Sequence, residues 1–216
     1  MKTITIASQK GGSGKTTLTA HLSVEAQRTA CAWIIDTDRQ ATLSQWHARR
    51  SADTPQRMDV PHSRIVEGIA RAQAQGADYC FIDTAPTVSD DNVALLRLAD
   101  LVVIPVRPSP ADLWAVVETV AEVKAAGKPF IFVLTQAKPN ALITAQAIAA
   151  LSQHGRVAQA FVADRVAYAS SMTGGDTAPE LDGRNPSRPE IAALWREIKS
   201  CFIENIVSKK KAVVHG

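Results

Sequence analysis

Short apolar runs alternate with helical patterns along most of this chain of 216 residues. The runs that predict strands are Thr3–Ser8, Ala32–Asp36, Tyr79–Asp83, Leu101–Val106, Phe130–Thr135 and Val157–Val162. Helical patterns lie between them, at residues 15–28, 63–75, 89–98, 110–126 and 141–153. Apolar strands that alternate with helices are typical of a parallel sheet covered on both faces. We therefore expect an α/β fold: a single domain with a twisted, mostly parallel sheet and helices on both of its faces.

A last helical pattern begins at Ser187. Ser187 with Glu190 three residues further on predicts a capping box at its start. Its apolar residues share one helical face, as core packing requires: Ile191, Leu194, Trp195, Ile198, Phe202 and Ile206. Residues 208–216 have no such period, so we place a domain over residues 1–207 and a basic, flexible tail over 208–216. The Gly, Asp, Asn and Pro content of Gly174–Pro186 predicts a loop that lies over the site or at a partner surface.

The first predicted strand and helix enclose a glycine-rich segment, Lys10-Gly11-Gly12-Ser13-Gly14-Lys15-Thr16-Thr17. It follows the P-loop pattern G-x-x-x-x-G-K-[ST], except that Gln9 occupies the first glycine position. The backbone of Gly11, Gly12, Ser13 and Gly14 can present N–H groups to phosphate oxygens. Lys15 supplies charge to the β- and γ-phosphates, and the Thr16 hydroxyl can bind Mg²⁺. A chance glycine-rich turn does not explain the flanking strand and helix, so we conclude that the chain binds a nucleoside triphosphate.

Composition leaves room for one domain and excludes some classes of protein. Apolar residues make up 46% of the chain, enough for one full core. No apolar run approaches the roughly 18 residues of a membrane span, and the first strand begins almost at Met1, so we expect no signal peptide. The scattered Cys31, Cys80 and Cys201 favour reduced thiols over disulfides or a metal site. A net charge of +3 does not by itself indicate a nucleic-acid-binding protein.

Two more predicted strands end in acidic residues. Asp36 and Asp38 follow the run Trp33–Ile35, and Asp83 ends the run Tyr79–Ile82. In a doubly wound sheet these strand ends lie at the same edge as the P-loop. Asp83 fits the Walker-B pattern, in which an acid holds Mg²⁺ or its water. One strand-end acid often only caps a turn, but two of them downstream of a P-loop predict a nucleotide site with its metal.

Three segments together resemble the ParA/MinD family of deviant Walker-A ATPases, in particular small plasmid-partition ParA proteins. They are Lys10–Thr17, the Ile-Asp-x-Asp-x-Gln pattern within Ile34–Gln40, and the apolar-Asp-Thr-Ala-Pro pattern of Phe81–Pro86. The proline-containing run Leu101–Pro110 is also similar to a segment of those ParA proteins. One residue departs from the family pattern, because Arg39 replaces the usual proline after the second Asp. This departure leaves the rate of hydrolysis open.

The resemblance implies a P-loop ATPase domain over residues 1–207 that uses ATP and Mg²⁺ and hydrolyses ATP slowly unless a partner stimulates it. Two subunits enclose two ATP molecules, and Lys10 reaches the phosphates of the partner's nucleotide. The catalytic residues implied are Lys10, Lys15 and Asp38, of which Asp38 positions the attacking water. Thr16, Asp36 and Asp83 hold the metal, and Thr17 bonds the α-phosphate. From the residues alone, Asp38 can instead cap a turn and Thr17 a helix.

Two further parts of the site are less determined by the sequence. Gln136 follows the strand Phe130–Thr135 and can bond adenine or simply end the strand. The loop Pro108–Asp112 is a second candidate for a wall of the base site. The resemblance favours ATP over GTP. For DNA, the basic residues that can contact phosphates are Arg184, Arg188, Arg196 and Lys199. A dimer would double their number, but a solvated helix face is the alternative.

We therefore expect an ATPase that, as an ATP dimer, binds non-specific DNA and positions or segregates DNA or a protein cargo. A ParB-like or adaptor protein would release it by stimulating hydrolysis, and the protein would be cytoplasmic and nucleoid-associated when ATP-bound. The alternative is a MinD-like ATPase on a membrane surface, but the tail offers only Ala212, Val213 and Val214 as apolar anchors. A third class, metabolic relatives that drive chemistry or metal-cluster loading, usually carries paired cysteines, and the sequence contains no C-x-x-C motif.

Overall fold

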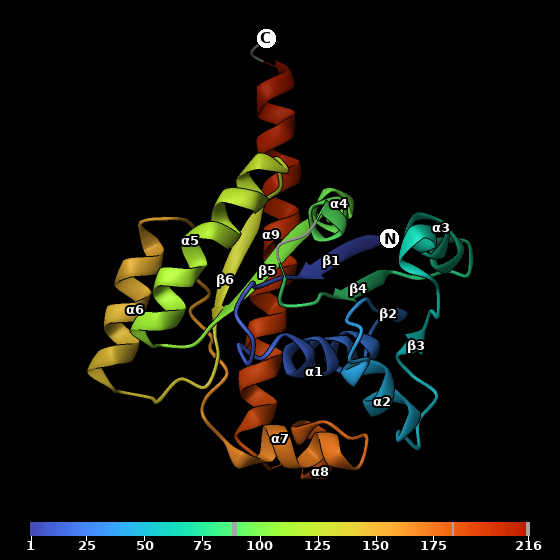
Figure 1. The fold of residues 1–216 in the computed structure, drawn as a ribbon, viewed down its shortest axis with the longest axis horizontal. Helices are drawn as coiled ribbons and strands as arrows, with labels where there is room; N and C mark the ends of the chain where they lie inside the picture. The colour runs from blue at the N-terminus through green and yellow to red at the C-terminus, as the bar shows by residue number, and fades with distance from the viewer. Residues whose placement is uncertain (88–89, 183, 215–216) are drawn as a thin grey trace.

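The computed structural model describes residues 1–87, 90–182 and 184–214, without the side chains of residues 90–91 and 204–214. Its centre is a sheet of strand order β3-β2-β4-β1-β5-β6, and all pairs among these strands are parallel (Figure 1). The strands are β1 (Lys2–Ile6), β2 (Ala32–Asp36), β3 (Gln56–Arg57), β4 (Tyr79–Asp83), β5 (Leu101–Val106) and β6 (Phe130–Leu134). The predicted α/β class and parallel sheet are confirmed.

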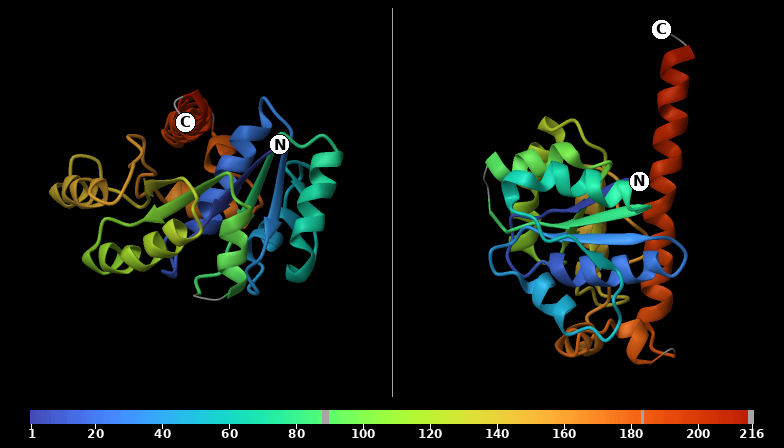
Figure 2. Two further views of the ribbon diagram at one scale, coloured as in Figure 1. Left: turned by 90° about the horizontal axis from the view of Figure 1, so that it is seen from above. Right: turned by 90° about the vertical axis from the view of Figure 1, so that its right-hand side faces the viewer.

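Helices cover both faces of this sheet, as the apolar runs predicted. One face carries α1 (Lys15–Gln27), α2 (Thr42–Ala48), α7 (Val166–Thr173), α8 (Ala178–Leu181) and α9 (Ser187–Val214). The other carries α3 (Ile65–Ala74), which follows the 3₁₀ turn η1 (His62–Arg64), α4 (Asp90–Leu98), α5 (Pro110–Ala125) and α6 (Leu142–Ser152). The right-hand view of Figure 2 shows the sheet edge-on, with α1 and α2 on one side and α3 on the other.

The side chains of a strand alternate between the hydrophobic cores on the two sides of the sheet, because successive residues of a strand point to opposite faces. On β2, Ile34 packs into the core beside α1, whereas Trp33 and Ile35 pack into the core beside α3. On β4, Phe81 and Ile82 divide in the same way. β2 and β4 are therefore apolar along most of their length, and each ends in an aspartate.

Helix α9 confirms the predicted apolar face and extends the helix beyond its expected end. Ile191, Leu194, Trp195, Ile198 and Phe202 are buried against α1 and the sheet, while the side chain of Ile206 is not described. The helix continues to Val214. Figures 1 and 2 both show these last turns projecting from the domain. The domain boundary and the flexibility of the tail stay predictions, and residues 215–216 lie outside the described residues.

The expected strand Val157–Val162 is not a strand. Only isolated bridges occur there, joining Phe132 to Val157 and Ala137 to Ala163. The carboxylate of Glu197 on α9 accepts the N–H groups of Gln159 and Ala160 at 2.8 and 2.7 Å. These two donors are therefore unavailable to a ladder beside β6. The sixth strand is β3, two residues long and at the opposite edge.

The capping box predicted at Ser187 is also wrong. The Glu190 carboxylate contacts Arg165 and Tyr168 instead of reaching back, and the buried Ser187 hydroxyl has no partner among the described residues. A capping box occurs instead at Thr177 and Glu180, where it starts α8 inside the expected loop Gly174–Pro186. The sequence patterns also missed α2 and α7. The predicted start of a helix at Ser89 lies outside the described residues.

Candidate functional site

The P-loop joins β1 to α1 at the carboxyl edge of the sheet. Gly12 and Gly14 adopt left-handed conformations, with φ of 72° and 92°. A Cβ atom at Gly14 would lie 3.5 Å from Cγ2 of Thr135, so the loop runs directly against the end of β6. Thr135 donates its hydroxyl to the carbonyl of Ser13 at 2.7 Å, and the Gln136 amide donates to the carbonyl of Gly12 at 3.2 Å. The end of β6 therefore fixes the shape of the loop.

The loop contains a polar atom and a space that a phosphate group would use. The hydroxyl of Ser13 is buried and has no hydrogen-bond partner among the described residues. A Cβ atom at Gly11 would meet nothing within 4 Å. Buried polar groups are normally satisfied, and backbone N–H groups at the start of a helix bind anions. The residues present therefore fit a nucleotide phosphate.

Lys15 lies under the loop and is buried, with 7% of the residue exposed. Its ammonium donates to the carbonyl of Lys10 at 3.3 Å. Burial lowers the pKa of Lys15, and the nearby carboxylates of Asp83 and Asp38 oppose this shift. Lys10 is half-buried, and no hydrogen bond or ion pair joins its ammonium to a residue of the described chain. Lys15 is thus enclosed in the loop, whereas Lys10 keeps its charge available.

Thr16 and Asp83, two of the three expected metal ligands, are brought into direct contact. The Thr16 hydroxyl donates to Oδ2 of Asp83 at 2.6 Å, and Thr19 donates to the other oxygen at 3.4 Å. Asp83 is buried, which raises its pKa to about 7; the bond from Thr16 opposes this shift and nearby Asp36 reinforces it. A hydroxyl and a buried carboxylate are oxygen ligands of the kind Mg²⁺ takes. A bound cation would also favour the ionised form of Asp83.

Asp36 and Asp38 lie at the same edge but are turned into their own loop. Asp36 pairs in register with Asp83 across β2 and β4. Its two oxygens accept the N–H groups of Asp38 and Ser44, at 3.1 and 2.8 Å, which ties the loop to the first turn of α2. Asp38 accepts the N–H of Gln40 at 3.0 Å, the turn-capping contact that was its alternative role. The metal role of Asp36 and the water-positioning role of Asp38 stay predictions.

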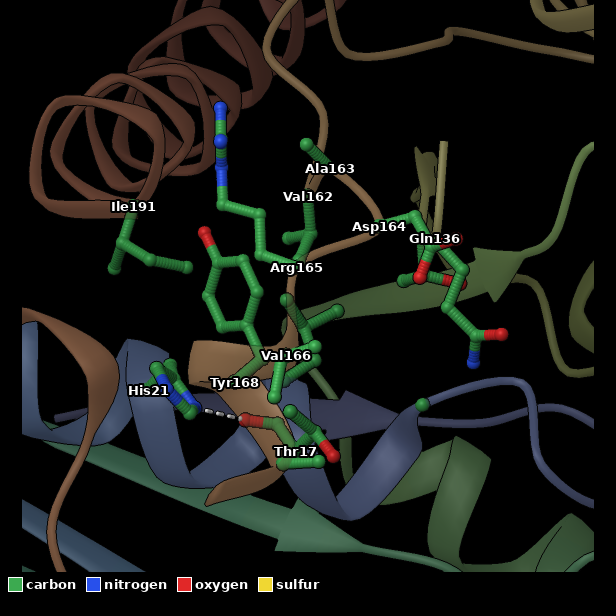
Figure 3. A pocket seen from close by; sticks show the side chains of 14 residues that line it. Thr17, His21, Gln136, Val162, Ala163, Asp164, Arg165, Val166, Tyr168 and Ile191 are labelled. Atoms are coloured by element: carbon green, nitrogen blue, oxygen red, sulfur yellow. Dashed lines mark hydrogen bonds between the residues drawn. The ribbon is translucent and has the colours of Figure 1, made fainter. Parts of the chain in front are cut away.

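A cavity of about 240 Å³ opens beside the P-loop, between α1 and the segment that leads into α7 (Figure 3). Its walls are mostly apolar and include Leu18, Val162, Val166, Tyr168 and Ile191. In Figure 3, Gln136 and Asp164 lie close together on the side away from His21 and Tyr168. An apolar slot with a few polar groups is typical of a small-molecule site. The loop Pro108–Asp112, the other proposed wall, does not line this cavity.

His21 connects the first turn of α1 to the start of α8. Its Nδ1 lies 2.7 Å from the Thr17 carbonyl, and its Nε2 accepts the N–H of Ala178 at 3.0 Å. A carbonyl cannot donate, so the ring is neutral with its proton on Nδ1. Burial lowers the pKa of His21 to about 4, against the opposing effect of the bond to Thr17. Figure 3 shows this contact below the ring of Tyr168. No local pattern in the sequence marks His21 as a site residue.

Helix α2, which follows the loop of Asp36 and Asp38, is attached to the same segment. The Trp46 indole donates to the carbonyl of Asp176 at 3.0 Å. Arg50 donates to the carbonyl of Gly175 at 2.8 Å and to both oxygens of Glu180. A Cβ atom at Gly175 would lie 2.4 Å from the backbone of Arg49, so only glycine allows this close approach. The segment before and within α8 therefore contacts both α2 and the P-loop helix.

An open hollow of about 440 Å³ lies on the other side of the site. Its lining residues come from the loop after β2, the loop after β4, η1 and α4, and include Asp38, Arg39, Pro86 and His62. The Nε2 atom of His62 is buried and has no partner among the described residues. The sequence analysis missed His62, which has no motif around it. The unusual Arg39 is exposed at the rim of this hollow.

The predicted DNA-binding residues lie along α9 and just before it. Arg184, Arg188 and Arg196 are exposed, and the Lys199 ammonium lies 5.8 Å from the centre of the Trp195 ring. Two acids of the same helix are turned toward α7 and the segment before it. Glu190 accepts from Arg165 and Tyr168, and Glu197 accepts backbone N–H groups of that segment. Their charges are therefore engaged inside the domain rather than presented beside the basic residues.

Within the part of the chain that the structure describes, no helix combines the length and the apolar character that crossing a membrane requires.

Comparison with known proteins adds independent findings. A family model described as the CobQ/CobB/MinD/ParA nucleotide binding domain matches residues 4–178. The chain is 27% identical to maintenance of carboxysome distribution protein A of Halothiobacillus neapolitanus, over 91% of this chain and 95% of that protein. An ATP complex of a McdA variant from Cyanothece has a TM-score of 0.74 at 19% identity, covering 93% of this chain and 95% of that one. MinD with Mg-ADP from Pyrococcus horikoshii OT3 has a TM-score of 0.75 at 17% identity, covering 91% and 95%. At these identities, the two structures bear on the fold alone.

Proposed function

The chain belongs to the CobQ/CobB/MinD/ParA family of nucleotide-binding proteins, and from this premise we propose that it is a positioning ATPase of the ParA type. It forms a dimer around two ATP molecules, binds non-specific DNA in that state, and positions or segregates DNA or a protein cargo. An adaptor or ParB-like protein stimulates hydrolysis and so releases it. This role places it in the cytoplasm, and on the nucleoid when ATP is bound. Residues 1–207 form the ATPase domain.

One observation carries the proposal: the P-loop holds a buried lysine and an unsatisfied hydroxyl beside a Thr16–Asp83 contact. Gly11, Gly12, Ser13 and Gly14 supply N–H groups to the β-phosphate, and Lys15 places its charge between the β- and γ-phosphates. Thr17 faces the α-phosphate. The cavity beside the loop takes the base, with Gln136 and Asp164 at its polar side and apolar walls against its faces. The family favours adenine as that base.

Thr16 and Asp83, with Asp36 near them, would hold Mg²⁺, which neutralises phosphate charge when bound. Hydrolysis then needs an oriented water on the γ-phosphate side. Asp38 lies in the loop after β2, and in this role it exchanges its turn-capping bond to Gln40 for the water. Lys10 neutralises charge on the nucleotide of the second subunit, as an arginine finger does.

The DNA contacts proposed are Arg184, Arg188, Arg196 and Lys199. They contact phosphates rather than bases, so binding is independent of sequence and falls with salt. The inward orientation of Glu190 and Glu197 supports this surface, because it removes two acids from it. The relative from Halothiobacillus is named for the distribution of carboxysomes, and this name supports a protein assembly as one class of cargo.

Co-sedimentation tests this function against its alternative, a membrane-surface ATPase of the MinD type. The protein is incubated with ATP and Mg²⁺, with ADP and Mg²⁺, or without nucleotide, and offered either DNA or anionic liposomes. We expect sedimentation with DNA in ATP alone, and loss of that binding in the Lys15→Ala variant. Binding to liposomes but not to DNA would contradict this proposal and favour a membrane-surface ATPase.

A further inference from the structure

Arg107 follows β5 and is held in one orientation by a buried acid. Its Nε and Nη2 atoms donate to the two oxygens of Asp112, at 2.9 and 3.1 Å. Asp112 is 3% exposed and also accepts the hydroxyl of Ser109, the N-cap of α5. A two-pronged contact of this kind fixes the plane of a guanidinium group. Asp112 lies in the first turn of α5, where the helix dipole also stabilises its charge, so its burial does not depend on Arg107 alone.

The third nitrogen of this guanidinium, Nη1, lies against the P-loop. A Cβ atom at Gly12 would come 3.7 Å from it. Close by, Thr119 of α5 accepts the N–H of Gln9 at 3.4 Å. The segment from Gln9 to Gly12, which carries Lys10, is therefore flanked by α5 and by Arg107. About a third of the Arg107 side chain is exposed (32%), so the group is accessible from outside the loop.

We propose that Arg107 is a second phosphate-facing cation of this site, acting beside Lys10. Asp112 uses one edge of the guanidinium and leaves Nη1 to bond a phosphate oxygen at the outer side of Gly12. The Lys10 ammonium has no hydrogen-bond or ion-pair partner in the described chain, whereas Asp112 already orients the Arg107 guanidinium before a phosphate binds. The inference rests on the proposed nucleotide function. The inference adds to that function a fixed positive charge, on the side of the P-loop that α5 covers.

The phosphate has two possible sources: the nucleotide in the same P-loop, and the nucleotide bound by a second copy of the chain. The test compares Arg107→Gln and Arg107→Lys with Arg97→Gln, which removes an exposed arginine of α4. Affinity for a fluorescent ATP analogue is measured with Mg²⁺ at protein concentrations where the chain is monomeric. ATP-dependent dimerisation is measured by light scattering, and the melting temperature monitors folding.

We expect Arg107→Gln to lose at least about tenfold in one of these two quantities, with Arg107→Lys intermediate and Arg97→Gln unchanged. A loss of monomer affinity identifies the phosphate of the same subunit. Unchanged monomer affinity with loss of ATP-dependent dimers identifies the phosphate of the partner.

If affinity and dimerisation both stay within twofold of the unsubstituted protein, Arg107 is only a structural partner of Asp112 and the inference is overturned. A lower melting temperature with unchanged affinity and dimerisation would also overturn the inference. The proposed function fails in a different way, namely when the unsubstituted protein itself binds no ATP analogue while remaining folded.

Discussion

The hydroxyl of Thr16 lies 2.6 Å from Oδ2 of Asp83, and this contact joins the first turn of α1 to the end of β4. The two residues are 67 positions apart in the chain, and the parallel order of β4 and β1 places them side by side. The Thr16 hydroxyl is thus bonded to the carboxylate oxygen for which a metal ion would compete. Mg²⁺ bound with a nucleotide would compete with this hydrogen bond, and Thr16 and Asp83 are the residues that would hold it.

Lys15→Ala should lose about 3 kcal/mol of binding free energy for ATP, roughly a hundredfold in Kd, because the charge that meets the phosphates is removed. Lys15→Arg should fail as well, since a planar guanidinium does not fit the space of a compact ammonium. Isothermal titration with ATP and Mg²⁺ measures both. Lys124→Ala, at an exposed position of α5, is the control. An affinity that is unchanged in Lys15→Ala would contradict the P-loop assignment.

Asp38→Ala should retain ATP but slow its hydrolysis by roughly a hundredfold, because water positioning is lost while the phosphate contacts remain. The dimer should then persist after ATP is added. Phosphate release and light scattering on one sample measure the two effects together. If hydrolysis continues at the unsubstituted rate, the role belongs to another residue of the hollow, and Arg39 and His62 are the first to replace.

The sequence predicted the class of fold and the place of the P-loop between β1 and α1, because these depend on local patterns. Apolar runs that end in Asp36 and Asp83 specify both the sheet and its carboxyl edge, and the P-loop specifies its own turn. The expectation for Val157–Val162 failed because a carboxylate from α9, Glu197, takes the N–H groups that a strand would need. That contact spans distant parts of the chain and leaves no local signal.

Distant contacts also explain why the sequence did not reveal the cavity beside the P-loop and the residues that support it. His21 is an ordinary polar residue in a helical pattern until Ala178 is placed beside its Nε2. The capping box was expected at Ser187 because a Ser-x-x-Glu pattern occurs there. The structure uses Glu190 to hold Arg165 and Tyr168 instead. Tertiary contacts of a side chain override its local pattern in both cases.

His21 gives the fold a specific dependence on pH. Its pKa is about 4 when folded, below the ordinary value of 6.5, so the unfolded chain binds more protons between these values. The stabilisation is complete above the unfolded pKa and is lost as the pH falls toward 4. From pH 7 to pH 5 this residue should lower the free energy of unfolding by about 2 kcal/mol.

Urea unfolding of the unsubstituted protein and of His21→Gln at several pH values isolates this effect, because the carboxylates contribute equally to both. The variant should be less stable at pH 7, since it loses one of the two ring contacts, and its stability should change less on acidification. Parallel pH curves for the two proteins would show that His21 is not buried in the neutral form.

Arg188→Ala and Arg196→Ala test the proposed DNA surface. Each lost phosphate contact should reduce the slope of log K against log salt by about 0.9, and affinity should fall equally for unrelated DNA sequences. Fluorescence anisotropy with ATP and Mg²⁺ at several salt concentrations measures the slope. Arg97→Ala removes the same charge from α4 and serves as the control. An unchanged slope would indicate that these residues form only a solvated helix face.

Lys10 carries the central claim, an ATP dimer in which each subunit places charge on the nucleotide of the other. Its ammonium has no hydrogen-bond or ion-pair partner in the described chain, whereas Lys15 is enclosed in its own loop. Light scattering with ATP and Mg²⁺ compares the unsubstituted protein with Lys10→Ala and with the control Lys124→Ala. We predict that the unsubstituted protein and the control double in mass, while Lys10→Ala binds ATP with near-normal affinity and stays monomeric. A Lys10→Ala protein that dimerises with ATP and hydrolyses it at the normal rate would contradict the account.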